Sequence, residues 1–596
     1  MTAADFYNST LLGLQDQLAK RQKRKSAFGI LRFGSVAAII AAFYFLYSFG
    51  WVYVLMAAVI LVAIFLRLVI LDLANKEAIS HLLELIRVNK DELLALEGKY
   101  YHFEDGNSLI PKEHYYAADL DILGHASLFQ FLNRTTSEMG SQLLAAWLLT
   151  PATVTEILKR QRAVAELITK NTWRQRLQAF GREKKISFST LYRLQAWMTD
   201  SSVFRQFKPW NWLRYLLPTI ILAISMLAWF DLVSMQLFYG SLLIFAAIAY
   251  QINKFVAPIH EQLSKMVEEL DSMSRSIDAI EREVFNSELL DELQQQLATS
   301  SGKASLKLKS LKKILDRLDI RYNIVVSFPL NIFLLWNLQQ VLDLEKWKAN
   351  NTESVNSWFS TLGCYEALNS FATLHYNNPG WVFPRLATEH FSLHANKLGH
   401  PLINENKRVN NFIDIYKKGE IMLVTGSNMA GKSTYLRSVG INVILAMAGA
   451  PVCAQEFSVS PVQLLSSMRV ADNLEESTST FYAELKKLKT VIDKVNNHQK
   501  VFVLLDEILR GTNSLDRHTG SVAFVKQLIK QHAAAILATH DVELAALQPL
   551  YPENILNFHF DVQVNNEQLY FDYKLKPGVC TSMNASILMK QIGIEI

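Results

Sequence analysis

The chain has 596 residues, of which half are hydrophobic and only 19% are charged. This length is enough for several domains, and the composition is more apolar than that of an ordinary soluble protein. The net charge of +5 comes from 60 basic and 55 acidic residues, a balance too even to indicate a nucleic-acid-binding protein by charge alone. The three cysteines have no paired or metal-like spacing, which favours reduced thiols in a cytosolic setting.

The N-terminal region predicts a membrane hairpin at 31–70, after a basic cytoplasmic segment at 1–30. No charged residue occurs from Phe33 to Leu66, and the apolar run breaks around a turn at 48–51. We therefore expect two spans, about 31–49 and 51–70, each near the roughly 20 residues that a helix needs to cross a bilayer. Basic residues flank both ends, which places both ends in the cytoplasm. A buried hairpin of a soluble domain is the alternative, and the run is too long and too far from the N-terminus for a cleavable signal peptide.

A second apolar pair at 212–252 predicts another hairpin, with spans at about 212–230 and 232–252 and a turn at Asp231. Pro218 is expected near a helix start, where proline is tolerated. A core hairpin of a large α domain would have a similar sequence, but basic residues at one side only favour a span. Four spans would make the chain a multi-pass protein of the cell (inner) membrane. The bilayer would then be a partner, and the rest of the chain would lie in the cytoplasm.

Two helical regions, 71–211 and 253–385, enclose the second hairpin. Apolar residues recur there at alternating spacings of three and four: Leu263, Met266, Leu270, Met273, Ile277, Ile280 and Val284. This pattern is typical of a coiled-coil seam, and a long helix packed on its own domain explains it equally well. A basic cluster follows at Lys303, Lys307, Lys309, Lys312 and Lys313. It is more often a solvated face than a contact for nucleic acid or anionic lipid.

A glycine-rich segment at 424–434 predicts a phosphate-binding loop. Its sequence is Val-Thr-Gly-Ser-Asn-Met-Ala-Gly-Lys-Ser-Thr, which fits G-x-x-x-x-G-K-[ST] at every required position. An apolar strand precedes the segment and a helical run follows it, as the motif requires. Lys432 can reach the β- and γ-phosphates of ATP, and Ser433 can ligate Mg²⁺. An ordinary glycine-rich turn is the alternative. The expected nucleotide-binding residues are Gly426, Ser427, Asn428, Met429, Ala430, Gly431, Lys432, Ser433 and Thr434.

Two further strand ends complete the expected site. The apolar strand 501–505 ends in Asp506 and Glu507, an acidic pair at the carboxyl end of a buried strand. Asp506 would hold Mg²⁺, and Glu507 would orient or deprotonate the attacking water. A third strand, 534–538, is followed by His540. A histidine in such a position is usually structural, but at the third strand end of one sheet it can sense the γ-phosphate.

The wording of these motifs resembles that of the MutS family. The loop is similar to the family's Thr-Gly-Pro-Asn-Met-Gly-Gly-Lys-Ser-Thr, with Ser427 and Ala430 in place of a proline and a glycine. Residues 506–516 resemble its Asp-Glu-Ile-Gly-Arg-Gly-Thr-Ser-Thr-x-Asp motif, and residues 476–485 resemble its Ser-Thr-Phe-x-x-Glu signature. Other matching segments are 119–120, 132–140, 147–151, 160–164, 399–401 and 584–585.

The resemblance covers about 115–596. It implies an all-α lever and core region followed by an α/β P-loop ATPase domain of the ABC type at 386–596. It also implies Mg²⁺-dependent ATP hydrolysis, a homodimer, and DNA as a ligand. Ser479 and Thr480 would reach the γ-phosphate bound to the opposite subunit. The second hairpin stands where the family carries its DNA clamp on the lever helices.

The chain departs from the family pattern in two places. Phe6-Tyr7-Asn8 does not match the Phe-x-Glu wedge of the mismatch-reading domain. Arg408-Val409-Asn410-Asn411 stands where the family usually has an aromatic residue that stacks on adenine. The resemblance therefore predicts ATP binding better than mismatch recognition.

Three functions are compatible with these motifs. The first is a membrane-anchored, MutS-like ATPase that acts on DNA in mismatch repair or recombination. The second is an ATP-driven transporter, although the sequence has no Leu-Ser-Gly-Gly signature and two short hairpins make a poor translocation path. The third is an ATP-gated membrane scaffold that does not bind DNA.

Overall fold

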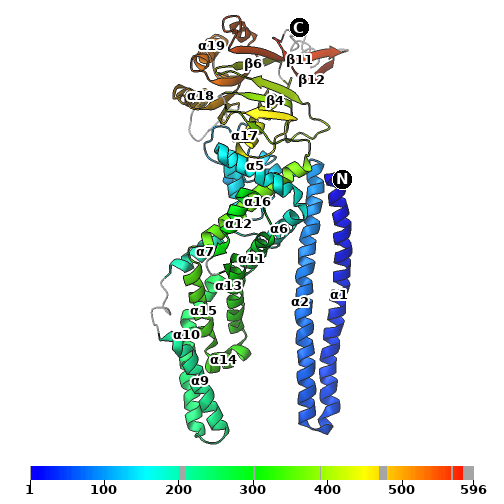
Figure 1. Cartoon of the computed structure of the whole chain (residues 1–596), viewed down its shortest axis with the longest axis vertical. Coiled ribbons are helices and arrows are strands. Elements are labelled where there is room, and N and C mark those ends of the chain that lie inside the picture. Colours follow the sequence, from blue (N-terminus) through cyan, green and yellow to red (C-terminus); the bar gives the residue numbers. More distant parts are fainter. Residues whose placement is uncertain are drawn as a thin grey trace.

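A computed structural model of the chain describes residues 2–200, 209–299, 302–388, 391–427, 429–468, 480–565 and 568–580. The molecule is elongated (Figure 1), with an α/β unit at one end and a helical core beneath it. Two helical hairpins extend from the core, and both point away from the α/β unit. The N-terminal end of the chain lies beside the core, at the end of the first hairpin that is nearer the α/β unit.

The first hairpin consists of two long antiparallel helices, α1 (Ala3–Leu46) and α2 (Trp51–Leu96). A short 3₁₀ turn, η1 (Tyr47–Phe49), joins them, and Gly50 reverses the chain at φ +115°. The turn therefore lies where the charge-free run breaks. Both helices continue well beyond the expected spans, since their polar halves pair with each other. Arg32 of α1, for example, donates to the buried carboxylate of Asp72 on α2 at 2.6 Å.

The second hairpin consists of α9 (Trp210–Trp229) and α10 (Met235–Ser264). Pro218 lies inside α9 rather than near its start, and α10 continues past the expected end of its span at 252. Within the described ranges, four helices are long and apolar enough to cross a membrane: α1, α2, α9 and α10. A fifth candidate arises if two consecutive helices bent by 77°, α14 (Ile324–Leu334) and α15 (Trp336–Asn351), are taken as one segment.

The helical core surrounds α16 (Val355–Asn377), which packs against α4 and α5. Its other helices are α3 (Leu128–Leu132), α4 (Glu138–Leu149), α5 (Val154–Thr169), α6 (Asn171–Glu183), α7 (Phe188–Thr199), α11 (Val267–Arg282), α12 (Glu288–Gln295) and α13 (Ala304–Leu318). Short elements join them: η2 (Asn107–Leu109), η3 (Asp319–Tyr322) and the two-stranded β1 (Ala298–Thr299) and β2 (Gly302–Lys303). The side chain of Glu366 on α16 accepts hydrogen bonds from Thr136 and Ser137, which fixes α16 to the segment that leads into α4.

The candidate coiled-coil seam packs inside the helical core. The helix breaks between α10 and α11, and α11 packs against α6 and α13 of the same chain. The seam residues are buried in these contacts except Val284, which is 72% exposed. The apolar spacing therefore reflects packing on the chain's own domain. In the basic cluster, Lys312 pairs with Asp271 at 2.7 Å, whereas Lys303, Lys309 and Lys313 are exposed.

The α/β unit is built on a six-stranded sheet of order β12-β11-β6-β10-β9-β8. All neighbours in it are parallel except β11 and β12. The strands are β6 (Ile421–Gly426), β8 (Gln463–Ser467), β9 (Val501–Asp506), β10 (Ala534–Thr539), β11 (Ile555–Asn565) and β12 (Gln568–Pro577). Every residue of β6, β9 and β10 is buried, as expected for central strands covered on both faces.

A second, four-stranded sheet has the order β3-β7-β4-β5. Its strands are β3 (Arg385–Leu386), β4 (Leu393–Leu398), β5 (Asn411–Ile415) and β7 (Glu456–Val459). The helices of the unit are α17 (Lys432–Ala448), α18 (Thr480–Asn496) and α19 (Ser514–Lys530), with the 3₁₀ helix η4 (Val542–Leu547). Helix α17 joins the two units, because it contacts the strands β6, β9 and β10 and also the core helices α4 and α5.

A buried ion pair joins the first hairpin to the helical core. The guanidinium of Arg134 donates to both carboxylate oxygens of Glu92 on α2, at 2.5 and 3.1 Å. Both side chains are at most 5% exposed. Asn377 at the end of α16 donates to the same carboxylate at 2.8 Å and accepts from the hydroxyl of Tyr7 on α1 at 2.8 Å. Both hairpin helices are therefore bonded to the core at this point.

We expect Glu92→Ala to destabilise the protein by about 3–5 kcal/mol, because it leaves the Arg134 guanidinium buried without its partner. The free energy of unfolding would be compared by thermal melting of the purified protein in detergent. Glu97→Ala is the matched control, since Glu97 closes the same helix but its pair with Lys99 is exposed. Equal melting temperatures for the Glu92 variant and the parent would contradict this role of the pair.

Candidate nucleotide site

The glycine-rich loop joins β6 to α17 with a tightly curled backbone. Gly426 and Gly431 adopt φ +148° and +106°, which L-residues rarely occupy. A Cβ on Gly426 would lie 2.8 Å from the carbonyl oxygen of Phe560 on β11. Met429 has φ +70° and is 76% exposed at the tip of the loop. The strand–loop–helix arrangement predicted for 421–447 is therefore present, and Asn428 lies outside the described residues.

Lys432, the first residue of α17, is held against its own loop. Its Nζ donates to the carbonyl oxygens of Gly426 and Ser427 at 2.8 and 2.9 Å. Burial lowers the pKa of this ammonium, and the carbonyl oxygens of its own loop satisfy two of its donors. The amine is thus aimed at the concave side of the loop, where backbone N–H groups and a helix N-terminus favour an anion.

The acidic pair and the histidine meet at the same edge of the sheet. Asp506 ends β9 and is buried, and Glu507 follows it at φ +49°. The carboxylate of Glu507 lies 2.5 Å from His540 Nε2 and 3.0 Å from Arg510 Nε. The hydrogen bond with His540 is the largest effect that lowers the pKa of Glu507, so the carboxylate is ionised at neutral pH. His540 Nε2 also lies 3.3 Å from Lys432 Nζ.

A cavity of about 600 Å³ opens in front of the loop, within the size range of small-ligand sites. Predicted residues that line it are Ser427, Met429, Gly431, Lys432, Ser433, Thr434 and Glu507. Ser433 lies in the exposed first turn of α17 and lines the cavity, whereas Asp506 is buried at the end of β9 and is not among the lining residues. A hydroxyl and a carboxylate offer the oxygen ligands that Mg²⁺ prefers, so the chemistry of these two side chains suits a magnesium ion.

The cavity is also lined by an aromatic residue that the sequence analysis missed, Tyr573 on β12. A Cβ on Gly431 would come within 3.1 Å of its ring, so the ring lies directly against the loop. Tyr573 also has φ +51°, a conformation that costs free energy for a non-glycine residue. Such strained residues often mark functional positions.

The segment 408–411 supports this aromatic residue instead of supplying one. Asn411 donates to the carbonyl oxygen of Tyr573 at 3.1 Å and accepts from the N–H of Leu575 at 2.9 Å. Arg408 also lines the cavity, but its guanidinium donates to the carbonyl oxygen of Ile403. No local sequence pattern indicates Tyr573, since β12 is placed at the site by antiparallel pairing with β11 and by its bonds to Asn411.

His400, from the Gly-His-Pro segment at 399–401, forms part of the floor of the cavity. Burial lowers its pKa to about 4, and the charges of Arg437 and Arg408 act in the same direction. The imidazole is therefore neutral at neutral pH and does not add positive charge to the site.

The signature segment packs on the loop that follows the acidic pair. Glu484 of α18 is buried, and its carboxylate accepts a hydrogen bond from the N–H of Leu509. Phe481 packs so closely on Gly511 that a Cβ there would lie 2.6 Å from the phenylalanine side chain. Ser479 lies outside the described residues. Thr480 begins α18, and its side chain also lies outside the described part of the chain.

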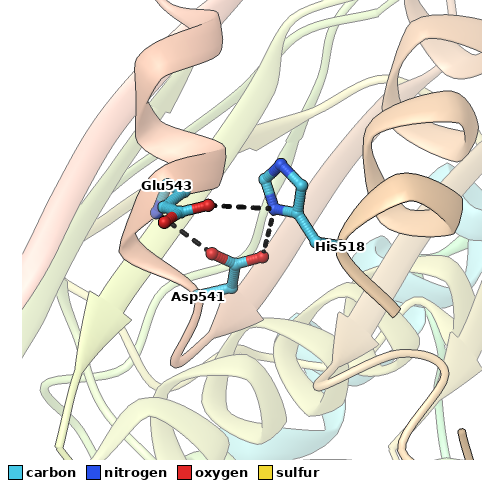
Figure 2. A group of neighbouring side chains, drawn as sticks. All are labelled: His518, Asp541 and Glu543. Carbon is cyan, nitrogen blue, oxygen red and sulfur yellow. Dashed lines mark hydrogen bonds and ion pairs between the residues drawn. The ribbon is translucent and has the colours of Figure 1, made fainter. Parts of the chain in front are cut away.

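A second polar cluster includes Asp541, the residue that follows His540 in the sequence (Figure 2). His518 of α19 faces Asp541, with Nδ1 2.6 Å from a carboxylate oxygen, and Glu543 lies 3.9 Å from the same nitrogen. Three such ligand atoms within 4.8 Å of one another could hold a cation. However, the other oxygen of Asp541 already accepts the N–H of Glu543 at the start of η4. The hydrogen-bonded contacts account for this cluster as a link between α19 and the end of β10.

The structure therefore defines a class of proteins with two units: an all-α unit, and an α/β unit that carries a glycine-rich loop at the end of one strand. Two family models match the chain in the same order, MutS domain III over residues 117–328 and MutS domain V over residues 422–591. Together they cover more than half of the chain. The chain belongs to the MutS family.

Characterised relatives match part of the chain. A human protein named MutS protein homolog 4 is 30% identical over 205 residues, 33% of this chain and 22% of the relative. A DNA mismatch repair protein MutS from Ehrlichia chaffeensis is 33% identical over 220 residues, 36% of this chain and 26% of the relative. The protein of that name from Listeria monocytogenes is 32% identical over 220 residues. The chain thus spans less than a third of the length of the relatives that it matches.

Proposed function

We propose that this protein is a membrane-anchored, MutS-like ATPase that binds and hydrolyses Mg²⁺-ATP in a dimer and acts on DNA. The observation that carries the ATPase proposal is the meeting of three strand ends. His540, after β10, lies between the other two residues: its Nε2 is 3.3 Å from Nζ of Lys432, after β6, and 2.5 Å from the carboxylate of Glu507, after β9. These groups bring a cation, an ionised carboxylate and an imidazole to one edge of the cavity.

Each residue of this group has a distinct role in the proposed reaction. Lys432 offsets the charge of the β- and γ-phosphates, and the loop N–H groups position them. Ser433 and Asp506 hold Mg²⁺, which when bound stabilises negative charge on the transferred phosphoryl group. Glu507 orients the attacking water and accepts its proton, a role suited to its ionised state. His540 holds the carboxylate of Glu507 in place through their hydrogen bond. The same imidazole would also contact the γ-phosphate.

The proposal of DNA as a ligand rests on the MutS-family domains and on the names of the relatives, two of which are called DNA mismatch repair proteins. The alternative is an ATP-gated membrane scaffold without DNA binding. Binding of the detergent-solubilised protein to duplex DNA across a salt series separates the two. Phosphate contacts give affinity that falls steeply with salt, and no binding at low salt would favour the scaffold.

The membrane proposal is supported by the surface of the two hairpins. Their outer halves expose large apolar side chains, including Phe33 at 79%, Trp51 at 65% and Leu243 at 74%. A soluble protein rarely exposes so much contiguous apolar surface. Both hairpins point away from the α/β unit (Figure 1), so one bilayer could receive both. The termini and the ATPase unit would then lie in the cytoplasm.

Tyr573→Ala should weaken ATP binding about 5- to 150-fold, because loss of stacking on a base costs roughly 1–3 kcal/mol. Affinity for tripolyphosphate, which has no base, should be unchanged. Tyr570→Ala serves as the control, since Tyr570 lies on the same strand and is exposed. Both affinities would be measured by calorimetry, and an equal loss for the two ligands would argue against stacking.

Glu507→Gln should bind ATP as the parent does but lower the rate of hydrolysis by about 10²- to 10⁴-fold, because the amide cannot accept a proton from water. Lys432→Ala should instead lose ATP binding through the missing charge. Steady-state phosphate release and equilibrium binding test both expectations. Glu543→Gln, which removes an exposed carboxylate nearby, should behave as the parent. Unchanged turnover in Glu507→Gln would refute the assignment.

A dimer with shared sites makes a further prediction. Lys432→Ala and Ser479→Ala should each abolish hydrolysis alone, whereas a mixture of the two should recover one working site per mixed dimer. The reason is that Ser479 is expected to complete the site of the opposite subunit. Dimers would be verified by light scattering. If verified mixed dimers stay inactive, completion in trans is wrong.

The topology predicts that the protein stays with the membrane during alkaline carbonate extraction. In intact cells, a cysteine in place of Asp231 at the tip of the second hairpin should react with an impermeant maleimide. A cysteine in place of Glu353, exposed in the helical core, should react only after permeabilisation. Release of the protein by carbonate, or labelling at 231 from the cytoplasmic side alone, would overturn the four-span arrangement.

A further inference from the structure

A short apolar helix, α14, lies at the tip of the lever formed by α13 and α15. The chain has no charged residue or histidine from Tyr322 to Leu342. Within α14, Ile324 is 79% exposed, Val325 is 81% exposed and Phe328 is 65% exposed. A helix that is apolar on all sides belongs either in a protein core or in a membrane. Among the residues that the structure describes, few contacts bury the side chains of α14, and its buried residues are Ser327 and Ile332.

The covered side of α14 packs on the second hairpin. Ile332 forms a small apolar cluster with Ile221 of α9 and Phe245 of α10. Ile221 follows Arg214 by two turns, so this cluster lies about 10 Å of helix beyond the last charged residue of α9. Phe245 lies about 13 Å of helix beyond Lys254 on α10. The contact of α14 is therefore with the part of the hairpin that we propose to be in the bilayer.

A set of polar contacts lies on the core side of this cluster. Arg214 of α9 donates to Gln339 and Asp343 of α15 at 2.7 and 3.2 Å. On the other side, His260 of α10 lies 2.8 Å from Asp319, just before α14. These polar contacts join the lever to the hairpin on both sides of α14 in the sequence, through Asp319 before it and through Gln339 and Asp343 after it.

The direction of α14 also differs from that of the lever. Leu335 adopts φ +47° between α14 and α15, and the two helices are bent by 77°. Helix α14 therefore crosses the foot of the lever, next to α9 and α10 (Figure 1). Its 11 residues are too few to span a bilayer, and such segments are typically interfacial or re-entrant.

We infer that α14 is embedded in the cytoplasmic leaflet beside the second hairpin, with lipid acyl chains covering Ile324, Val325 and Phe328. This inference rests on the proposed membrane insertion of that hairpin. Lipid fits as the occupant because Leu222 of α9 and Ile244 of α10, which are exposed apolar residues, directly neighbour in sequence the residues that contact α14, Ile221 and Phe245. The lever would then contact the bilayer directly, in addition to its attachment through the hairpin.

Depth-dependent quenching in liposomes tests the inference. Single cysteines would be placed at Val325, at Ile244 as the hairpin reference, and at Leu306, an exposed apolar residue at the opposite end of α13. Cys580 would be replaced by serine. Burial raises the pKa of Cys364 to about 11 and that of Cys453 to about 12, so both thiols react slowly with a fluorescent maleimide at neutral pH. Each labelled full-length protein would be exposed to nitroxide-bearing lipids and, separately, to aqueous iodide.

We expect the probe at Val325→Cys to lose most of its fluorescence with nitroxide lipid and little with iodide, as the Ile244→Cys probe should. The Leu306→Cys probe should show the reverse. Quenching of the Val325 probe by iodide alone would overturn the inference while leaving the hairpin in the membrane. Protection from both quenchers would also overturn it, because it would indicate a protein partner such as a second copy. If the Ile244 probe is not quenched by lipid, the proposed anchoring itself fails. Phe328→Cys provides a second position if Val325→Cys does not fold.

Discussion

The buried contact between Glu92 and Arg134 is the interaction on which the arrangement of the two halves depends. A guanidinium and a carboxylate that are both withdrawn from water cannot separate without a large cost in free energy. Asn377 donates to the same Glu92 carboxylate and accepts from the hydroxyl of Tyr7, so α1, α2 and α16 are held at one point. The first hairpin is thus an extension of the helical core and not an appendage on a linker.

From this point, direct packing leads to the nucleotide site. Helix α16 packs on α4 and α5, and both of these contact α17, whose first residue is Lys432. At Gly440 the packing is so close that a Cβ would meet Leu120 of the core and Leu504 of β9 at 2.8 Å. The helix that begins at the glycine-rich loop therefore has little room to move independently of the helical core. The candidate nucleotide site and the first hairpin are therefore connected by an unbroken series of packed helices.

Much of the site could be predicted from the sequence because it is encoded locally. Buried β-branched strands, a glycine-rich turn and an acidic pair each have a short-range pattern, and parallel pairing of β6, β10 and β9 brings their ends together. Tyr573 had no such pattern, since its place depends on the long-range pairing of β12 and on Asn411. The MutS family usually has an aromatic residue at the position of 408–411. In this chain the amide of Asn411 lies there instead and holds β12, which carries Tyr573.

In the fold as well, the locally encoded features could be predicted from the sequence and those that depend on long-range contacts could not. The charge-free runs located both hairpins, but hydropathy alone could not predict that α1 and α2 continue far into polar sequence. Pairs across the hairpin, such as Arg32 with Asp72, stabilise these polar halves, and they are visible only once the helices are aligned. The apolar spacing at 263–284 predicted a buried helix face but not its partner, which proved to be α6 and α13. The apolar segment around α14 escaped notice because it is shorter than a span.

The continuation of α2 beyond its apolar half has a consequence for the space around the protein. Residues 71–92 form about 33 Å of uninterrupted helix between the expected membrane boundary and the buried pair at Glu92. In the proposed membrane arrangement, this part of α2 would set the distance between the lipid headgroups and the α/β unit. A rigid helix of fixed length would limit the size of the ligands that can enter between the membrane and the α/β unit from the side. Larger assemblies could reach the α/β unit only from the face that points away from the membrane.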